Sequence, residues 1–391
     1  MEKSVIVAAV RTPIGSFQGC LAPLKATDLG AVVIHEALVR AGIDGKKVDE
    51  VIMGCVLTAG LGQNPARQAA IGAGIAEDVG AFTVNKVCSS GLLAVILADE
   101  LIRLGEREIV VAGGMESMTN APYILPNARG GMRLGDSKAV DSMVFDGLWD
   151  IHTNQHMGSC AEMCAEKYGF TRKMQDEFAA ASYKKALGAI ESGAFKGEII
   201  GVEVAQKKGG AKIFDTDEEP ARVNFDKMAT LKPSFIKDGT VTAANASSIS
   251  DGAAALVVMS ESWAKKQRIT PMCQIVAHAT HSHAPEWFTT APIGAIKKVL
   301  EKANLSADDI DIFEINEAFS PVTMAAIKEF NLDESKVNVS GGAVALGHPI
   351  GASGARILVT LLYAMKRLDK KTGLAVLCNG GGEATAMIVK M

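Results

Sequence analysis

The stretch Ser4-Val-Ile-Val-Ala-Ala-Val, near the start of the chain, recurs in altered form as Cys273-Gln-Ile-Val-Ala-His-Ala near its end. Three further pairs of segments recur in the same order, at offsets of about 260 residues: Val48-Asp-Glu-Val-Ile-Met-Gly and Ile310-Asp-Ile-Phe-Glu-Ile-Asn, Phe82-Thr-Val-Asn and Val337-Asn-Val-Ser, and Ile109-Val-Val-Ala-Gly-Gly and Leu374-Ala-Val-Leu-Cys-Asn-Gly-Gly. Because such short β-branched runs alternate with helical patterns, the repeat predicts two copies of one α/β unit, built around mostly parallel sheets.

Helical patterns separate these predicted strands, and they cover residues 28–40, 92–104, 176–192, 289–303 and 355–368. The predicted fold class is therefore α/β, with two repeated layered halves of mixed sheets and helices. We place the first half at 1–118 together with 249–270, and the second half at 271–391. The intervening stretch 119–248 is rich in Gly, Lys and Asp, and we interpret it as an inserted loop domain. Long insertions on a rigid scaffold often carry binding functions.

Composition excludes several classes of protein. The formal net charge of −4 argues against a nucleic-acid binder. The seven cysteines are an odd number without a framework spacing, and no secretory segment precedes them, which favours reduced thiols and a cytoplasmic location. The apolar runs are too short to span a membrane.

Cys88 is the first candidate catalytic residue. It lies in Asn85-Lys-Val-Cys-Ser-Ser-Gly, directly after a predicted strand and before the helical pattern 92–104. At the start of a helix the macrodipole favours the thiolate, which is the nucleophilic form of cysteine. The alternative is a small buried apolar residue, which is a common fate of a free cysteine.

His348 lies among five glycines between residues 341 and 354, ahead of the helical pattern 355–368. Dense glycine lets the backbone approach a ligand closely and frees N–H groups to bind it. A histidine there can act as the base for a thiol, although a histidine packed in a turn is the alternative. The glycine spacing does not match a dinucleotide-binding or phosphate-binding loop.

Cys378 and Asn316 each follow a predicted strand. Cys378 opens Cys-Asn-Gly-Gly-Gly-Glu, whose glycines can aim N–H groups at a developing oxyanion. Because it ends a strand of the second half, we expect the two thiols, Cys88 and Cys378, to meet across a pseudo-dyad. Asn316 can position a water or a carbonyl oxygen, or it can simply cap a helix.

Together these motifs resemble the thiolase family, and within it the short-chain members. The resemblance runs from Arg11 to the C-terminus, and its most specific motifs are Val87-Cys-Ser-Ser-Gly, Gly113-Gly-Met-Glu-Ser-Met, Asn316-Glu-Ala-Phe, Gly347-His-Pro-Ile-Gly-Ala-Ser-Gly and Cys378-Asn-Gly-Gly-Gly. It implies a thiolase-like fold and an acyltransferase that joins two acetyl-CoA into acetoacetyl-CoA plus CoA, or runs the reverse reaction. A broader 3-ketoacyl-CoA thiolase of fatty-acid or branched-chain breakdown is the alternative.

The resemblance also implies a role for each candidate catalytic residue. Cys88 would be the acetylated nucleophile with His348 as its base, and Cys378 would remove the α-proton of the second acetyl-CoA. One oxyanion hole would consist of His348 and a water held by Asn316. The other would consist of the backbone N–H groups of Cys88 and Gly380.

The CoA path is carried over from the same resemblance. Ser247 and Ala243 match the pantetheine path, and Phe288 and Phe319 match walls of the acyl pocket, where plain core packing is the alternative. The full set of expected substrate contacts is Leu148, His156, Met157, Arg222, Phe235, Ala243, Ser247, Phe288, Ala318 and Phe319. Arg222, Lys207, Lys208 and Lys227 are candidate partners for the CoA phosphates, although a solvated basic face is the alternative for the lysines.

Other features bear on cofactors and partners. Some members of the family bind potassium through a tyrosine in the insertion, but Pro220 stands at that position here, so we expect no cofactor. Family members form dimers that commonly pair into tetramers, so we expect a homotetramer. The residues that bear on 2-methyl substrates, Phe288 among them, leave acyl specificity open.

Two rival functions would use part of the same set of residues. A ketoacyl-synthase type of condensing enzyme would lack Cys378, and a silent acyl-CoA-binding protein would not need all four candidate catalytic residues.

A stripe with a spacing of four residues resembles a zinc site but is interrupted by Gly158; it consists of His152, His156, Cys160 and Cys164. A second cluster, His278, His281 and His283, is expected on a surface loop. We predict no metal at either place.

Overall fold

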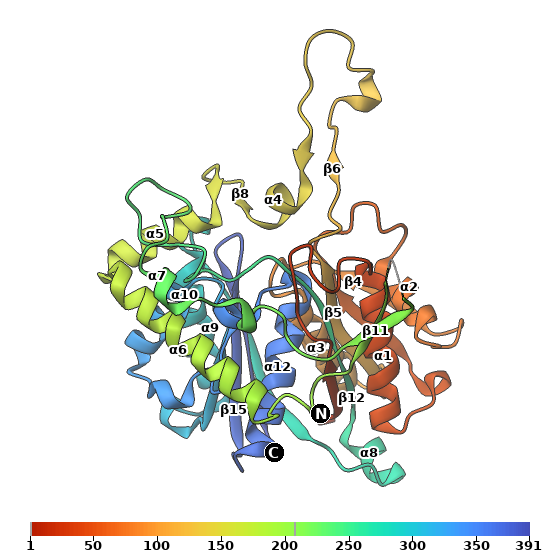
Figure 1. The fold of residues 1–391 in the computed structure, drawn as a ribbon. Coiled ribbons are helices and arrows are strands. Elements are labelled where there is room, and N and C mark those ends of the chain that lie inside the picture. Colours follow the sequence, from red (N-terminus) through yellow and green to blue (C-terminus); the bar gives the residue numbers. More distant parts are fainter. Residues whose placement is uncertain (1, 207–208) are drawn as a thin grey trace.

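The segments with which the repeat begins form two neighbouring strands in the computed structural model, which describes residues 2–206 and 209–391 (Figure 1). These strands, β1 (Ser4–Arg11) and β13 (Cys273–Ser282), pair in an antiparallel manner at the centre of a ten-stranded sheet within the described residues. The other strands of this sheet are β2 (Gly15–Ser16), β3 (Glu50–Gly54), β4 (Gly80–Val84), β5 (Ile109–Ser117), β12 (Ser250–Ser260), β14 (Ile312–Ile315), β15 (Thr372–Asn379) and β16 (Glu383–Lys390).

The strand order reads the same from both ends. From the centre outward it is β1-β12-β5-β3-β4 in one direction and β13-β16-β15-β14 in the other. The place that β4 takes beside β3 is taken in the second half by Val337, which forms a single bridge with Phe313 of β14. The α/β fold with two repeated halves is therefore confirmed.

The prediction of mostly parallel sheets is wrong. The β3–β4, β3–β5 and β14–β15 pairs are parallel, whereas β1–β12, β12–β5, β13–β16 and β15–β16 are antiparallel. The four matched segments left out β12 and β16, which are the strands that run against their neighbours. The connection from β15 to β16 is a short turn, which can join only antiparallel strands.

One of the sequence matches is also out of register. Met53 pairs with Gly113 in the first half, and Ile315 pairs with Val376 in the second. If Met53 corresponds to Ile315, Gly113 corresponds to Val376 and not to Cys378. The Gly-Gly pairs lie inside β5 but after β15, so matching the two runs from their first residues places them two residues out of register. Cys378 then corresponds to Met115 and Asn379 to Glu116, whereas Cys88 lies on the turn after β4, so the two thiols are not related by the repeat.

The helices form layers around the strands (Figure 1). α3 (Ser90–Arg103) and α12 (Ile350–Arg367) pack against each other between the two halves, while α1 (Ala26–Ala41) and α9 (Ala291–Ala303) cover the outer sides. α12 is buried along almost its whole length, as a central helix must be. Where the inner helices cross, a Cβ on Gly91 would meet Ala355 N, and one on Gly354 would meet Leu92 N, so both positions require glycine.

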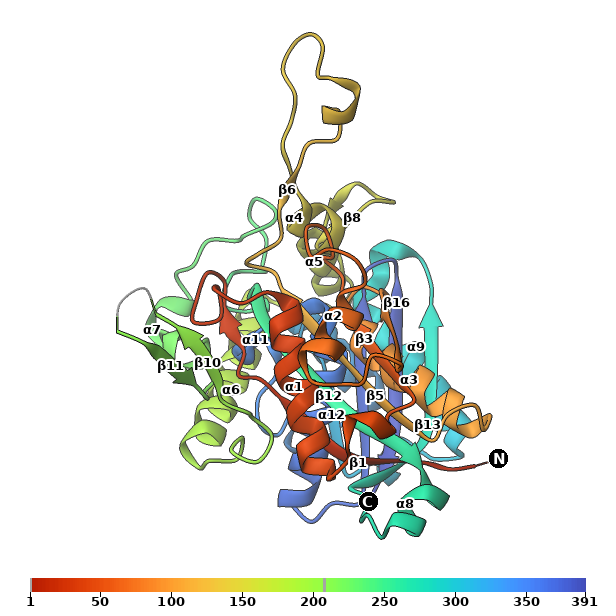
Figure 2. The ribbon, with the colours of Figure 1, turned by 90° about the vertical axis from the view of Figure 1, so that its right-hand side faces the viewer.

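The inserted residues lie beside these layers, and a hairpin from β6 (Tyr123–Ile124) to β7 (Val140–Asp141) projects far from the body in both views (Figures 1 and 2). The other elements of the inserted residues are η2 (Ala128–Gly130), α4 (Ser142–Gly147), β8 (Trp149–Asp150), β9 (Gln155–His156), α5 (Met157–Tyr168), α6 (Arg172–Glu191), β10 (Val202–Ala205), β11 (Ala211–Phe214), η3 (Pro220–Arg222) and α7 (Phe225–Met228). The boundaries 119–248 for an inserted domain stay a prediction.

The remaining helices complete the two halves: η1 (Gly45–Lys47), α2 (Pro65–Gly72), α8 (Glu261–Gln267), η4 (Pro285–Thr290), η5 (Ala307–Asp309), α10 (Ser320–Phe330), η6 (Glu334–Lys336) and α11 (Ala343–Leu346). All five predicted helices are present, with starts that differ from the prediction by two to five residues. Within the described residues, no helix is both long and apolar enough to cross a membrane.

Candidate active site

A cavity of about 370 Å³ opens where the two halves meet the inserted residues. Cys88, His348, Cys378 and Gly380 all line it. The predicted substrate contacts that also line it are Leu148, His156, Met157, Phe235, Ala243, Ser247, Phe288, Ala318 and Phe319. Two thiols that lie far apart in the sequence, one imidazole and several apolar side chains therefore line the same cavity.

Two predicted site residues lie outside the lining. Asn316 is buried behind the wall, where its Oδ1 accepts a hydrogen bond of 3.4 Å from Arg356 Nη2. Its Nδ2 has no partner among the described residues. Arg222 is exposed and lies 3.7 Å from Glu219, which itself lines the cavity.

Of the three lysines predicted to contact the CoA phosphates, one lies within the described residues. Lys227 is exposed on α7, and Lys207 and Lys208 lie outside the described residues. Eight lining residues were not predicted: Met118, Gly147, Glu219, Ser234, Ala246, Ser248, Ile249 and Ile350. Six of them lie within two residues of a predicted site residue, which is the signal that could have found them. Glu219 reaches the cavity only through the fold of the insertion.

Cys88 sits in a tight turn between β4 and α3. The N–H of Lys86 donates to Ser90 Oγ at 2.8 Å, and the Ser90 hydroxyl donates to the carbonyl of Val87 at 2.6 Å. Val87 has a positive φ of 47°, an unusual conformation for a β-branched residue that only a well-braced turn can hold. The turn places Cys88 two residues before the first residue of α3.

The resting state of Cys88 differs from the prediction. Burial of the thiol raises its pKa to about 12, although the N–H groups of Gly380 and of Cys88 itself oppose that rise. Burial therefore works against the thiolate that the start of the helix is expected to favour. Removing the sulfur from water outweighs the helix dipole, so the thiol needs a base when it reacts.

His348 is oriented as such a base. Its Nδ1 lies 2.6 Å from Ser353 Oγ, and the hydroxyl of Ser353 donates its one hydrogen to the carbonyl of Pro349 at 2.9 Å. Nδ1 must then carry the ring hydrogen, which leaves Nε2 with a free lone pair. Nε2 is buried and has no partner in the described part of the chain. Burial and the nearby Arg356 lower the pKa of the imidazole to about 3, so the ring is neutral.

Cys378 is the penultimate residue of β15 and lines the same cavity as Cys88. Burial raises the pKa of its thiol well above the ordinary value, and the nearby Cys88 raises it further. Apolar side chains from the insertion and from the second half surround it, among them Met157, Phe288 and Phe319. Both thiols therefore start protonated, and each can gain or lose a proton during a reaction.

Each half of the molecule anchors the reactive turn of the other. Asn379, at the end of β15, accepts a hydrogen bond of 2.7 Å from Ser89 beside Cys88. Glu116, at the end of β5, accepts one of 2.9 Å from the N–H of Gly351, close to His348. The Glu116 carboxylate also accepts from Val56 N at 3.0 Å and Leu57 N at 3.2 Å. Burial raises its pKa to about 7.

Neither of the metal patterns gathers into a site, since the described residues contain no group of three or more His, Cys, Asp or Glu side chains able to hold an ion. His156 caps α5 by accepting from the N–H of Gly158 at 3.0 Å, and its ring stacks on Phe235. His278 lies 3.2 Å from Asp99. These contacts give the histidines structural partners of their own.

Comparisons with known proteins agree with this geometry. Residues 4–262 match the model of the thiolase N-terminal domain, and residues 269–391 match the thiolase C-terminal domain. The chain belongs to the thiolase family. This confirms the resemblance inferred from the sequence, and the thiolase fold with it.

Named relatives extend over the full length of this thiolase. It is 53% identical over 388 residues to the acetyl-CoA acetyltransferase of Pseudomonas aeruginosa, with 99% of each chain covered. It is 53% identical over 392 residues to that of Escherichia coli, covering 100% of this chain and 99% of the relative. Among solved structures, Acat5 thiolase from Ascaris suum in complex with coenzyme A superposes with a TM-score of 0.95 at 46% identity, covering 100% of both chains.

Proposed function

We propose that this thiolase is an acetyl-CoA C-acetyltransferase, which condenses two acetyl-CoA into acetoacetyl-CoA plus CoA and catalyses thiolysis in reverse. The observation that carries the proposal is the shared cavity of Cys88, His348, Cys378 and Gly380. The relatives with that name span its full length, and a solved thiolase similar to it over the full length is in complex with coenzyme A.

The first half-reaction transfers an acetyl group to Cys88. Nε2 of His348 takes the thiol proton, and the sulfur attacks the thioester carbonyl carbon of acetyl-CoA. The N–H groups of Gly380 and Cys88 stabilise the resulting oxyanion. When the tetrahedral intermediate collapses, the bond to the CoA sulfur breaks, and that sulfur takes the proton of Cys378. CoA leaves as a thiol, and Cys378 is left as a thiolate.

The second half-reaction forms the carbon–carbon bond. The Cys378 thiolate removes an α-proton from a second acetyl-CoA, and the enolate attacks the acetyl carbon on Cys88. The protonated His348 and the amide of Asn316, through a water, stabilise the enolate oxygen. As acetoacetyl-CoA forms, the Cys88 sulfur departs and recovers the proton held by His348. All three groups return to their starting protonation states.

Two aromatic side chains line the cavity near Cys378. The rings of Phe288 and Phe319 lie 6.2 Å apart between centroids, in an edge-to-face arrangement, and both line the cavity. Both rings belong to the same apolar cluster as Cys378. Two bulky aromatic rings beside the second thiol support the short-chain assignment over a broader 3-ketoacyl-CoA thiolase, as do the full-length relatives named acetyl-CoA acetyltransferase. Comparing thiolysis of acetoacetyl-CoA, 2-methylacetoacetyl-CoA and longer 3-ketoacyl-CoA substrates tests this point.

Location and assembly follow as further parts of the proposal. All seven cysteines are free within the described structure, and six of them are buried, which supports a reducing compartment such as the cytoplasm. The projecting hairpin exposes apolar side chains, above all Leu134, which supports contact with other subunits in a homotetramer. Replacing Leu134 with Asp should lower the assembly state in sedimentation without changing the residues of the cavity.

The test of the function uses acetyl-CoA alone. Incubation should add one acetyl group to the peptide that contains Cys88, which mass spectrometry detects, and Cys88→Ala should remove both this adduct and thiolysis of acetoacetyl-CoA. A Cys88→Ala protein that still thiolyses acetoacetyl-CoA at the normal rate would overturn the mechanism.

A further inference from the structure

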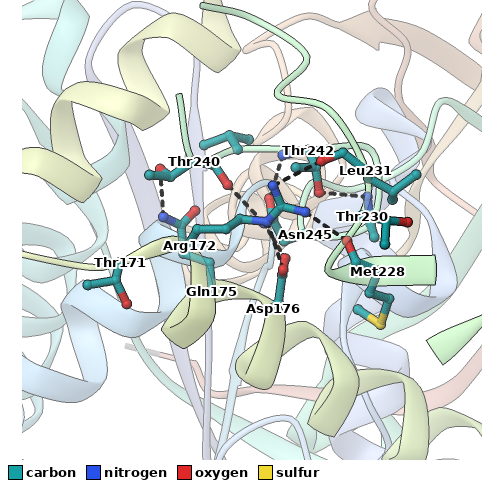
Figure 3. A network of polar contacts seen from close by, with 12 residues as sticks. Thr171, Arg172, Gln175, Asp176, Met228, Thr230, Leu231, Thr240, Thr242 and Asn245 are labelled. Atoms are coloured by element: carbon teal, nitrogen blue, oxygen red, sulfur yellow. Dashed lines mark hydrogen bonds and ion pairs between the residues drawn. The ribbon is translucent and has the colours of Figure 1, made fainter. Parts of the chain in front are cut away.

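A polar network at the start of α6 joins segments that form different walls of the cavity (Figure 3). Its centre is the carboxylate of Asp176. One oxygen, Oδ2, accepts from Arg172 Nε at 2.7 Å, and the other, Oδ1, accepts from Asn245 Nδ2 at 2.9 Å. None of these three residues lines the cavity, and Arg172 and Asp176 line a separate groove on the outer side of α6.

Arg172 holds the first wall. Its Nη2 donates to the carbonyl of Met228 at 2.7 Å, and its Nη1 donates to the carbonyl of Leu231 at 3.1 Å. A few residues later the chain reaches Ser234 and Phe235, which line the cavity. The guanidinium therefore ties this segment to α6 at two points, and its planar fork makes the geometry specific.

Asn245 holds two further walls. Its buried amide also donates to the carbonyl of Thr240 at 3.1 Å and accepts from the N–H of Thr242 at 2.8 Å, so its orientation is settled. The backbone carbonyl of Asn245 accepts from Ser320, both from N at 3.0 Å and from Oγ at 2.6 Å. Asn245 lies between Ala243 and Ser247, which line the cavity, and Ser320 directly follows the lining residue Phe319.

We infer that Asp176 is a positioning residue for CoA thioesters, which holds three walls of their binding cavity in register through Arg172 and Asn245. This inference rests on the proposed function, because it assumes that a CoA thioester occupies the cavity. A carboxylate suits the position because it offers two acceptor oxygens to two donors. An amide offers only one acceptor, so Asn at 176 would turn its NH₂ toward either Arg172 or Asn245.

The loop has a second anchor that does not involve Asp176. Glu162, on α5, accepts from the N–H groups of Thr240 and Val241, in both cases at 2.8 Å. Since this anchor remains, replacement of Asp176 should displace the cavity walls and leave the rest of the loop folded. The expected effect is therefore weaker binding of CoA, with little change in the chemistry at Cys88.

The first experiment measures CoA binding and turnover in Asp176→Asn. We expect the Kd of CoA, by titration calorimetry, and the KM of acetoacetyl-CoA to rise about tenfold, as loss of a charge-assisted hydrogen bond predicts, with kcat within about twofold of the parent value. Glu177→Gln is the matched control. Glu177 is the next residue of α6 and forms an exposed ion pair with Lys173 at 3.7 Å, so this variant should keep the parent Kd and KM.

The second experiment exchanges donor and acceptor. Asn245→Asp alone brings two carboxylates together and should raise the Kd of CoA more than Asp176→Asn does. In the double variant Asp176→Asn with Asn245→Asp, the amide at 176 can donate to the carboxylate at 245 and still accept from Arg172. The double variant should therefore bind CoA more tightly than Asn245→Asp alone, a recovery that general destabilisation does not produce.

Two results would overturn the inference. One is an Asp176→Asn protein that binds CoA as the parent does, whatever its melting temperature. The other is a double variant that binds CoA no better than Asn245→Asp. Failure of the proposed function looks different, because the parent protein would then bind no CoA and form no acetyl adduct on Cys88, and the inference would fall with it.

Discussion

The turns before α3 and α12 occupy equivalent places in the two halves and perform different tasks. Ser90 and Ser353 precede the two glycines at which these helices cross. The Ser90 hydroxyl braces backbone only, because it accepts from Lys86 N and donates to the carbonyl of Val87. Ser353 holds an imidazole, since its hydroxyl donates to the carbonyl of Pro349 and its oxygen contacts His348 Nδ1. Serines at equivalent places thus support a nucleophile in one half and a base in the other.

The strands that end beside these turns differ more strongly. β15 continues into β16 through the turn Gly380–Gly382, which keeps Cys378 and the N–H of Gly380 beside Cys88. The matching strand β5 ends at Glu116 and Ser117 and continues into the long insertion, which supplies walls of the cavity. The comparison teaches that duplication provided equivalent strand ends, and that the connection after each one decided what chemistry it carries.

The sharpest test of this asymmetry is Cys378→Ala, because the equivalent position in the first half carries no reactive group. We expect condensation to fall by about 10²–10⁴-fold, as loss of a general base predicts. Acetylation of Cys88 by acetyl-CoA should still occur, although more slowly than in the parent protein, because the departing CoA thiolate must then take its proton from water. Mass spectrometry of the adduct and rates of acetoacetyl-CoA formation measure the two steps separately. Equal loss of both steps would mean that the two thiols do not have separate roles.

Glu116→Gln breaks the anchor that the first half provides for the His348 turn. One donor among Val56, Leu57 and Gly351 would then face an NH₂ group, a mismatch that costs about 1–3 kcal/mol. If half of this cost appears in the transition state, kcat falls by about 2- to 13-fold. Glu108 is the residue before β5 begins and supplies the control, because Glu108→Gln should keep the parent kcat. Parent activity in Glu116→Gln would show that this anchor does not position His348.

The pH dependence of alkylation tests the state of the nucleophile. Burial raises the pKa of Cys88 to about 12, so the thiol is mostly protonated at any lower pH. The thiolate fraction, and with it the rate of alkylation by iodoacetamide, should rise about tenfold for each pH unit between pH 7 and pH 9. A rate that is already flat across this range would indicate a thiolate at rest and would restore the helix-dipole prediction.

The two serines compare the halves directly. Ser353→Ala removes the partner of His348 Nδ1, so the ring loses the contact that selects its tautomer, and we expect kcat to fall about tenfold. Ser90→Ala removes a brace of the backbone and should lower the melting temperature by several degrees, with a smaller change in kcat. If the two variants lose equal activity, the serines have the same structural role and the proposed difference between the turns is wrong.

Much of the fold and of the cavity could be predicted from the sequence. The four recurring segments and the helical patterns between them indicated a duplicated α/β unit, because alternation of apolar residues reports which faces are buried. The motifs around Cys88, Asn316, His348 and Cys378 were specific enough to indicate the family. The antiparallel strands β12 and β16 were missed, since a continuous apolar run reports burial on both faces but not the direction of its neighbour.

Local sequence alone therefore determined where strands, helices and reactive groups lie along this chain, and only the tertiary structure decided their chemical state. The pKa of Cys88 rises because burial removes its sulfur from water, and burial depends on every element packed around the cavity. The hydrogen bonds of Glu116, Asn379 and Asp176 join residues that lie far apart in the sequence. The tautomer of His348 depends on how its turn is held against Ser353. Spacing along a chain reports local geometry, whereas desolvation and long-range hydrogen bonds exist only once the chain has folded.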